Sequence, residues 1–385
     1  MKRRYREGDW FAVPLQPGRT IVGVIARQDR SRLFGYFFAP PALREEEALW
    51  RGCFAGDGIE DARWSIFAHA PDSEPREFSR APSAAELAAM PSARFESAAL
   101  VEARLRGLRE GLAVRELRSP LDASELARVP PAGRVQFGSP LTAQDVGALA
   151  ALLSARPDLE LRVHGFSREP FDATVFAQFR GLRRLVLDVR VPSLEVLTPL
   201  TATLESLALG RRAGVPFEPP ELPRLTSLEL HHVAIPAFAR SRLPALCRLA
   251  LVDTVQGDLE PVASLANLES LVVRYGACSD AAAIPALSRL QFLELRGLRE
   301  LGSLPPLDGL AALRSIVLAA LPRIVDLRAL ATAPALESVE VFAMGHLGVN
   351  DLDALREVRR LCHVSVDIGG RRKNREVYRR LAARA

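Results

Sequence analysis

The chain contains 385 residues, of which 48% are hydrophobic and 25% charged, a composition that is typical of globular proteins and excludes a disordered, collagen-like or coiled-coil chain. Its length predicts two domains, with enough residues for sizeable cores. The net charge of +5 is concentrated at the end of the chain, because residues 371–385 contain seven basic residues and one acid, so that the preceding 370 residues carry −1. A nearly neutral body argues against a nucleic-acid-binding surface.

The cysteines and the N-terminus bear on the compartment. Cys53, Cys247, Cys278 and Cys362 lie far apart and form no CxxC pair, which favours a reducing compartment over a disulfide scaffold or a zinc site. The first ten residues are charged and precede only a short apolar run, so they predict neither a signal peptide nor a membrane span. We therefore expect a bacterial cytoplasmic protein that does not associate with membranes.

Residues 1–80 are rich in short β-prone runs. Their aromatic and aliphatic side chains fall on both alternating sets of positions, which predicts strands that are buried on both faces, as in a curled sheet or a small barrel. The predicted strands are Trp10–Leu15, Thr20–Arg27, Leu33–Phe38 and Arg63–Ala68.

Three stretches of this region carry a family resemblance. Gly8–Leu15 (GDWFAVPL), Gly23–Arg27 (GVIAR) and Leu33–Phe38 (LFGYFF) resemble the Immunity protein 26 family, bacterial proteins that protect a cell from polymorphic toxins. The resemblance is confined to the first domain. It implies a predominantly β domain that binds a cognate toxin without catalysis.

Residues 81–130 are rich in alanine and punctuated by prolines. Ala84–Met90 and Ala98–Glu110 have helical spacing, and Pro130 and Pro131 mark an end. This pattern predicts a helical connector between the first domain and the rest of the chain.

A strand, a helix and a second strand are predicted next. Arg134–Phe137 is β-prone, Thr142 is suited to be the N-cap of an apolar helix that runs to Ser154, and Asp158–Gly165 is a second strand. We expect these elements to cover the exposed core at the start of the following region.

The region that follows consists of repeats with apolar residues at positions 1, 4 and 6 of each unit. The eight clear units start 21 to 23 residues apart, and a weaker ninth unit starts at Leu361. This pattern resembles the LxxLxL core of the leucine-rich repeat family. The eight units start at Leu182, Leu204, Leu225, Leu246, Leu268, Leu290, Leu313 and Leu336.

The repeat pattern has a direct physical meaning. Positions 4 and 6 point to the same side of a short strand, so each unit has an apolar face that only stacking against its neighbours can bury. We therefore predict that residues 131–370 form a solenoid with a parallel inner sheet and caps, which makes the whole chain an α+β protein. Prolines between the strands disfavour long helices on the outer side.

Position 9 departs from the family pattern, which has asparagine there. Without that side chain, the backbone groups after each strand must bond to neighbouring backbone or water, and we expect irregular turns and irregular convex sides. The residues at position 9 are Arg190, Arg212, Val233, Thr254, Gly276, Leu298, Leu321 and Met344.

The predicted C-terminal elements are a helix at Asp351–Arg360, a last strand at Cys362–Asp367 that the next two glycines end, and a basic helix or tail at residues 371–385. Asn374 is a candidate cap of that helix, and a solvated end is favoured over nucleic-acid recognition.

Motifs for chemistry are absent. The sequence has no GxxxxGK[ST], GxGxxG, HExxH or GxSxG, and Asp57–Asp61 lacks the spacing of a calcium loop. His231 and His232 are neighbours near a strand end, so their side chains should diverge rather than share a metal. We predict no enzyme activity, no cofactor and no metal site.

Candidate binding residues come from the strand alternation. Positions 3, 5 and 7 should face the concave side of the solenoid, where arginines and aromatics are typical of binding hot spots. Large apolar groups on an open sheet face suggest binding more strongly than arginines do; the alternative is that these are merely solvated sheet residues. The candidates are Arg184, His231, Arg248, Arg274, Phe292, Glu294, Arg296, Glu340 and Phe342, together with Tyr275 at position 8.

These observations favour a non-catalytic protein-binding module, an immunity protein that neutralises a cognate polymorphic toxin by direct binding. The alternative is a leucine-rich repeat scaffold or adaptor in bacterial signalling or assembly. A third hypothesis, an enzyme or nucleic-acid binder in the N-terminal domain, is disfavoured by the missing motifs and the nearly neutral charge.

Overall fold

The computed structural model describes the backbone of five N-terminal strands and most of the chain from residue 114 onwards. The later ranges are 114–122, 126–127, 129, 133–165, 171–210, 217–233, 242–253 and 256–382. The chain divides into two compact units, one of Met1–Val114 with Ala132–Arg134 and one of Arg115–Pro131 with Val135–Ala385.

The first unit contains an antiparallel sheet with the strand order β1-β2-β3-β4-β5. The four strands predicted here coincide with β1, β2, β3 and β5, whereas β4 was not predicted. Burial of these strands on both faces stays a prediction, and so do the helices expected at Ala84–Met90 and Ala98–Glu110, which lie outside the described residues. The strands are β1 Trp10–Leu15, β2 Arg19–Asp29, β3 Arg32–Phe38, β4 Trp50–Ala55 and β5 Ser65–Phe67.

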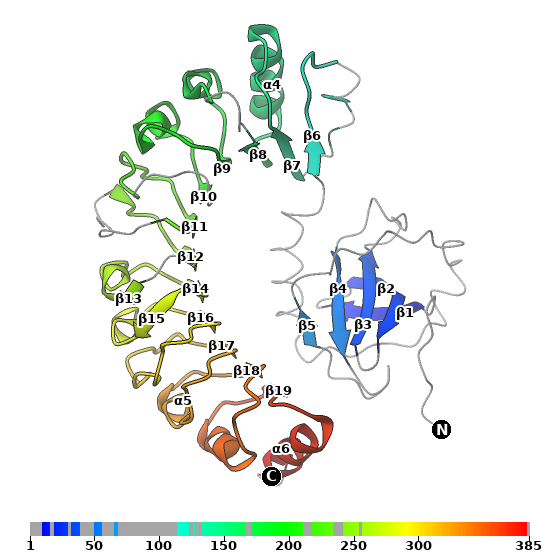
Figure 1. Cartoon of the computed structure of the whole chain (residues 1–385), viewed down its shortest axis with the longest axis vertical. Coiled ribbons are helices and arrows are strands. Elements are labelled where there is room, and N and C mark those ends of the chain that lie inside the picture. Colours follow the sequence, from blue (N-terminus) through cyan, green and yellow to red (C-terminus); the bar gives the residue numbers. More distant parts are fainter. Residues whose placement is uncertain are drawn as a thin grey trace. The chain divides into compact units, whose positions relative to one another are not determined.

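The second unit is a solenoid of leucine-rich-repeat type, whose strands line the inner side of an arc (Figure 1). From β8 to β19 every neighbouring pair is parallel, and equivalent repeat positions stand opposite each other, as Leu249 does to Leu271. The parallel inner sheet predicted from the repeats is thus confirmed. The strands are β6 Val114–Glu116, β7 Gly133–Phe137, β8 Leu159–His164, β9 Arg184–Asp188, β10 Ser206–Leu209, β11 Ser227–His231, β12 Arg248–Val252, β14 Ser270–Arg274, β16 Phe292–Arg296, β17 Ser315–Ala319, β18 Ser338–Phe342 and β19 His363–Asp367.

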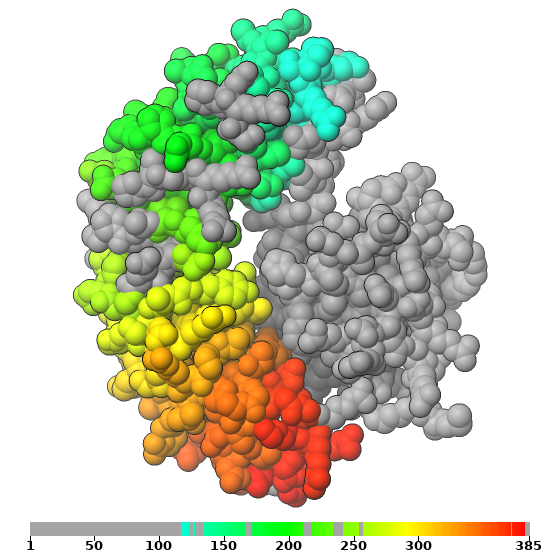
Figure 2. Space-filling model, in the orientation of Figure 1, coloured from blue at the N-terminus to red at the C-terminus, as the bar shows by residue number. Residues whose placement is uncertain are grey.

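The outer side of the solenoid is built from short elements, as the prolines predict. Pro199 lies inside η3, and η5 and η6 each have a proline in their first turn. Figure 2 shows the units from residue 256 to the C-terminal helix following one another in sequence order. The outer elements are η2 Ala173–Gln178, η3 Leu194–Leu200, β13 Gln256–Asp258, η5 Glu260–Val262, β15 Ala277–Asp280, η6 Ile284–Ala286, α5 Ala329–Thr332 and η7 Asn350–Glu357.

The core lies between the inner sheet and these outer elements. Positions 1, 4 and 6 are buried in every clear unit, for example Leu246, Leu249 and Leu251. A further buried row stands three residues before position 1, and its carbonyls accept the N–H of position 1 in most units. That row includes Phe179, Leu222, Leu243, Leu265, Leu287, Leu310 and Val358.

The turn after each strand is regular from β11 to β18, so the expectation of irregular turns was wrong there. Position 8 adopts the left-handed conformation in six consecutive units, with φ between 51° and 66°. In five of them its N–H donates to the position 7 carbonyl of the next unit, over 2.7 to 3.0 Å. Main-chain groups of neighbouring repeats thus pair with each other, as we expected for turns that have no asparagine. The six residues are His232, Asp253, Tyr275, Gly297, Ala320 and Ala343.

Position 9 itself has an apolar role in four units. Val233, Leu298, Leu321 and Met344 are buried there. Because the left-handed turn already pairs the backbone, position 9 is free to add apolar surface to the core.

The predicted strand, helix and strand are present at the N-terminal end of the solenoid. Helix α4 (Ala143–Ala155) lies between β7 and β8, and Thr142 is its N-cap in a reciprocal capping box with Asp145. Buried Asp145 also accepts hydrogen bonds from Ser119 Oγ (2.6 Å) and the Leu121 N–H (2.7 Å). The bond from Ser119, followed by those from Leu121 and Thr142, holds the pKa of Asp145 well below its ordinary value. Strand β6 lies within the predicted connector and forms the edge of the sheet.

Helix α6 (Arg371–Ala382) covers the other end of the solenoid, so this segment is not merely a solvated end. Val377 is buried, and Tyr378 Oη accepts the N–H of Val366 on β19 over 2.8 Å. Asn374 is not the cap that the sequence suggested, because it lies inside the helix and its Oδ1 accepts the Ile368 N–H (3.0 Å). The chain therefore completes the edge of its last strand with side chains of α6.

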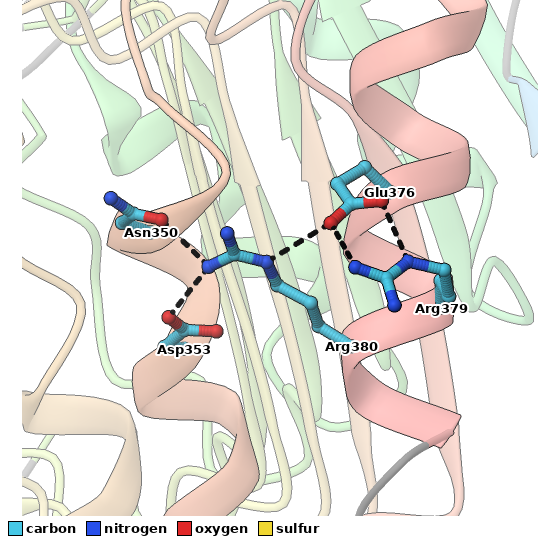
Figure 3. Close-up of polar contacts among 5 residues, drawn as sticks. All are labelled: Asn350, Asp353, Glu376, Arg379 and Arg380. Carbon is cyan, nitrogen blue, oxygen red and sulfur yellow. Dashed lines mark hydrogen bonds and ion pairs between the residues drawn. The ribbon is translucent and has the colours of Figure 1, made fainter.

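Arginines of α6 are also bound to neighbours (Figure 3). Arg380 contacts Asn350 (2.6 Å) and Asp353 (3.0 Å) of η7, and Glu376 contacts both Arg379 and Arg380. The hydrogen bond from Arg379 is the largest cause that lowers the pKa of Glu376, to about 2. Part of the terminal positive charge thus joins α6 to the repeats. No helix in the described part of the chain is long and apolar enough to cross a membrane.

Candidate functional site

The predicted site residues occupy the concave positions of the sheet. From β9 to β14, positions 4 and 6 are buried while positions 3, 5 and 7 are at least partly exposed, so the predicted alternation is confirmed in those strands. Arg184 lies on β9, His231 on β11, Arg248 on β12, Arg274 on β14, Phe292, Glu294 and Arg296 on β16, and Glu340 and Phe342 on β18; Tyr275 follows β14.

The exposure of these residues differs from the expectation in two respects. Glu294 and Glu340 are buried, with 5% and 2% of their surface exposed. Phe292 and Phe342 are half-buried rather than open on the face. Among the described residues the exposed large hydrophobic side chains are Tyr275 (52%) and Val325 (64%). Tyr275, and neither of the phenylalanines, is therefore the candidate residue that exposes a large apolar side chain.

The structure brings Arg274, Glu294 and Arg296 into direct contact. Arg274 and Arg296 are register partners on β14 and β16. Arg274 donates to both carboxylate oxygens of Glu294, from Nε (2.9 Å) and Nη2 (2.8 Å), and Arg296 Nε donates to Oε1 (2.8 Å). We call these three residues the arginine cluster. Its single carboxylate bridges two like charges that would otherwise repel each other across the strands.

The pKa values of Glu294 and Arg274 are shifted in opposite directions. Burial acts to raise the pKa of Glu294, but the hydrogen bonds and charges of Arg274 and then Arg296 prevail and lower it. Burial likewise acts to lower the pKa of Arg274, and the bonds to Glu294 outweigh it, so that this pKa is raised. Glu294 and Arg274 therefore stabilise each other's charged forms.

Tyr275 stands beside the arginine cluster. It is in the left-handed turn row with φ of 61°, and its N–H donates to the carbonyl of Arg296 over 2.7 Å. Its ring lies on Gly297, where a Cβ would come within 2.6 Å of the ring atom Cδ1. Gly297 also has a positive φ of 66°, so glycine meets both requirements at this position.

Acidic partners of the two histidines were missed by the sequence reasoning. His231 contacts Glu229 (2.5 Å) and His232 contacts Asp253 (3.1 Å), so the neighbouring histidines bind different carboxylates. The same alternation that selected His231 would have selected Glu229 at position 5. In the part of the chain that the structure describes, no group of three or more His, Cys, Asp or Glu side chains could hold a metal ion.

The described cysteines are free thiols in different environments. Cys278 is buried, which raises its pKa to about 11, and half-buried Cys247 also has a raised pKa because of burial. A thiol with a raised pKa is a poor nucleophile at neutral pH. Cys278 therefore fits the predicted role of a small core residue.

Comparison with models of protein families gives no match, and comparison with curated proteins gives none either. Several solved structures are similar in part. An internalin from Listeria monocytogenes is 18% identical with a TM-score of 0.45, over 67% of this chain and 82% of the internalin. The leucine-rich repeat domain of the type III effector XopL is 19% identical with a TM-score of 0.43, over 58% of this chain and 79% of that domain.

A leucine-rich repeat protein from Leptospira interrogans is 16% identical with a TM-score of 0.42, over 73% of each chain. The assignment of the fold does not depend on these likenesses. It follows from the repeat period, the parallel register and the buried leucine rows of this chain, which together define a solenoid of leucine-rich-repeat type.

Proposed function

We propose that this chain is a non-catalytic protein-binding module whose solenoid presents its concave sheet face to a protein partner. One observation carries the proposal: a half-exposed tyrosine stands beside two arginines whose orientation a shared glutamate fixes. Tyrosine and arginine are the residue types enriched in binding hot spots, and fixed side chains lose less entropy on binding.

Within this function, the proposed role is that of a bacterial immunity protein that neutralises a cognate toxin by direct binding. The resemblance of the first 80 residues to the Immunity protein 26 family supports it. A cytoplasmic location belongs to the same proposal, and the free thiols of Cys247, Cys278 and Cys362 support it because a reducing compartment preserves them.

The second candidate is a leucine-rich repeat scaffold or adaptor. The length of the solenoid favours it, because the sheet from β8 to β19 offers a long surface that needs no toxin to explain it. The two candidates differ in the identity of the partner. Purification from the native host with bound proteins, identified by mass spectrometry, separates a toxin from a signalling or assembly component.

The binding face is tested with a quadruple alanine variant of Arg274, Tyr275, Phe292 and Arg296. We expect it to remain folded and to bind the purified partner at least about 2 kcal/mol more weakly. The matched control replaces Arg289, Arg299 and Val325, which are exposed and lie outside the inner sheet. Unchanged affinity in the folded quadruple variant would assign the binding surface to the first unit instead.

A further inference from the structure

The arginine cluster has a local excess of positive charge. Its two guanidinium groups share one carboxylate, and its neighbours at positions 5 and 7 on the adjoining strands carry no charge. Those neighbours are Val252, Val272, Val317 and Ala319.

The acidic residues nearest to the arginine cluster are already engaged or stand further away. Glu229 lies two strands away on β11 and contacts His231, and Asp253, in the turn before Tyr275, contacts His232. Glu340 lies two strands away on the other side, on β18. The charge of Glu229 still acts on Arg274, but among the described strands that adjoin the cluster no second carboxylate forms an ion pair with either guanidinium.

Both arginines retain donors for a further ligand. The bonds to Glu294 use Nε and Nη2 of Arg274 but only Nε of Arg296, and about a third of each arginine side chain is exposed. Within the described part of the chain, the Nη1 groups have no other partner. A guanidinium held by one carboxylate and open at its remaining N–H groups is oriented to bind a second one.

Tyr275 adds a flat apolar surface next to these donors. Its ring lies on Gly297, which leaves one side of the ring against the backbone and half of the side chain accessible. The site therefore combines two oriented cations with one aromatic surface. This combination fits an acidic side chain together with the apolar atoms that flank it.

We propose that the arginine cluster and Tyr275 bind a carboxylate of an acidic segment on the protein partner. This inference rests on the proposed function, since it specifies the chemistry of the partner at that site. Glu294 is a positioning residue, because it fixes both guanidinium groups, and Arg274, Arg296 and Tyr275 contact the ligand. Carboxylate from protein is the occupant, because the net excess is a single positive charge rather than the extended basic surface that nucleic acid requires.

The test measures binding of a fluorescein-labelled octaglutamate peptide to the full chain by fluorescence anisotropy. We expect R274Q/R296Q to weaken binding at least about tenfold, whereas R289Q/R299Q changes it less than about twofold. Arg289 and Arg299 are a matched control because they are two exposed arginines of the same solenoid that lie outside the inner sheet. Equal losses in both variants, or no binding by the unaltered chain, would overturn the inference.

Two further arms keep the test decisive. The charge-preserving R274K/R296K variant should also lose affinity, since lysine cannot reproduce the planar two-point contact, and it replaces the glutamine variant if that variant unfolds. An octathymidylate with a similar charge should bind more weakly than octaglutamate; tighter binding that the same variants abolish would assign the site to phosphate. If a purified partner needs the concave face but the peptide does not bind, the proposed function stands and only the carboxylate inference is lost.

Discussion

The two faces of the inner sheet follow opposite rules. On the buried face, positions 4 and 6 carry leucine, valine or isoleucine in every unit, and all are nearly inaccessible. On the concave face, position 5 alone changes from valine to alanine, glutamate and serine along the sheet. The buried face thus repeats the same stacking contacts, whereas the side chains of the concave face differ from unit to unit.

The contribution of a side chain to the stability of the fold also differs between the two faces. Burying one leucine contributes about 1.5 to 3 kcal/mol, and neighbouring units need these contacts because none has a core of its own. The concave face contributes through local pairs such as Arg274 with Glu294, whose effect depends on geometry. Substitutions on the two faces should therefore differ in size, which the following variants test.

The largest effect is expected for Leu249→Asp. This residue is 2% exposed, so an unpaired carboxylate among the stacked units should lower the free energy of unfolding by several kcal/mol. The control is Ala250→Asp, one residue further along β12 and on the opposite face, which should have a much smaller effect. Chemical denaturation of both variants gives the comparison, and equal destabilisation would show that the assignment of faces is wrong.

Glu294→Gln should have the next largest effect. It leaves two guanidinium groups opposite each other without their carboxylate, at a cost of about 1 to 3 kcal/mol. Because the folded-state pKa of Glu294 is lowered, its contribution is complete above the unfolded-state pKa of about 4.3 and is lost as the pH falls through the folded-state pKa. The stability difference between the two proteins should therefore shrink in acid.

Glu337→Gln provides the matched control for Glu294. Its ion pair with Arg314 is largely exposed, so the change should cost less than about 1 kcal/mol. A cost at Glu337 as large as that at Glu294 would remove the distinction between the arginine cluster and an ordinary surface ion pair.

Tyr378→Phe extends the comparison to the end of the sheet, where α6 binds the backbone. Loss of the hydroxyl leaves the Val366 N–H without its acceptor and should lower stability by about 1 kcal/mol. Amide hydrogen exchange should accelerate at Val366 more than at Leu249. Arg372→Gln on the exposed side of α6 is the control and should change neither quantity.

The smallest effect is expected in the turn row at the boundary between the two faces. Ala320 has a φ of 51°, which is unfavourable for a residue with a Cβ, so Ala320→Gly should raise the stability by about 0.5 kcal/mol. Ala250→Gly, within a strand, should lower it by a similar amount. A loss of stability at residue 320 would mean that the left-handed row is not strained by alanine.

The sequence was sufficient to predict the elements whose signal repeats. The period of the leucines located the inner-sheet strands from β9 to β19 but not the outer strands β13 and β15, and Thr142 located the start of α4 because a capping residue has a local signature. The left-handed row at position 8 was missed because its members share a backbone conformation and no side-chain type. Strand β4 was missed because a six-residue segment with one glycine carries little pattern.

The site was predicted only as a set of positions. Alternation placed Arg274, Tyr275 and Arg296 near one another, but the burial of Glu294 depends on Arg274 of the adjoining strand β14 as well as on Arg296 of its own strand. The position of the Tyr275 ring depends on the absence of a side chain at Gly297, one repeat further along the chain. Such contacts arise from the register between units, which no single unit encodes.

The way α6 ends the solenoid affects how its length can change in evolution. Tyr378 accepts the N–H of Val366 on β19, Asn374 accepts the N–H of Ile368 just after this strand, and Lys373 donates to the carbonyls of Gly345 and Leu347. Much of the contact between α6 and the repeats is therefore made with main-chain atoms. The last two repeats and α6 therefore form the C-terminal cap of the solenoid. Duplication or loss of a whole repeat further upstream would leave the contacts between α6 and the last two repeats in place, so the length of the concave surface can change while the same C-terminal end is kept.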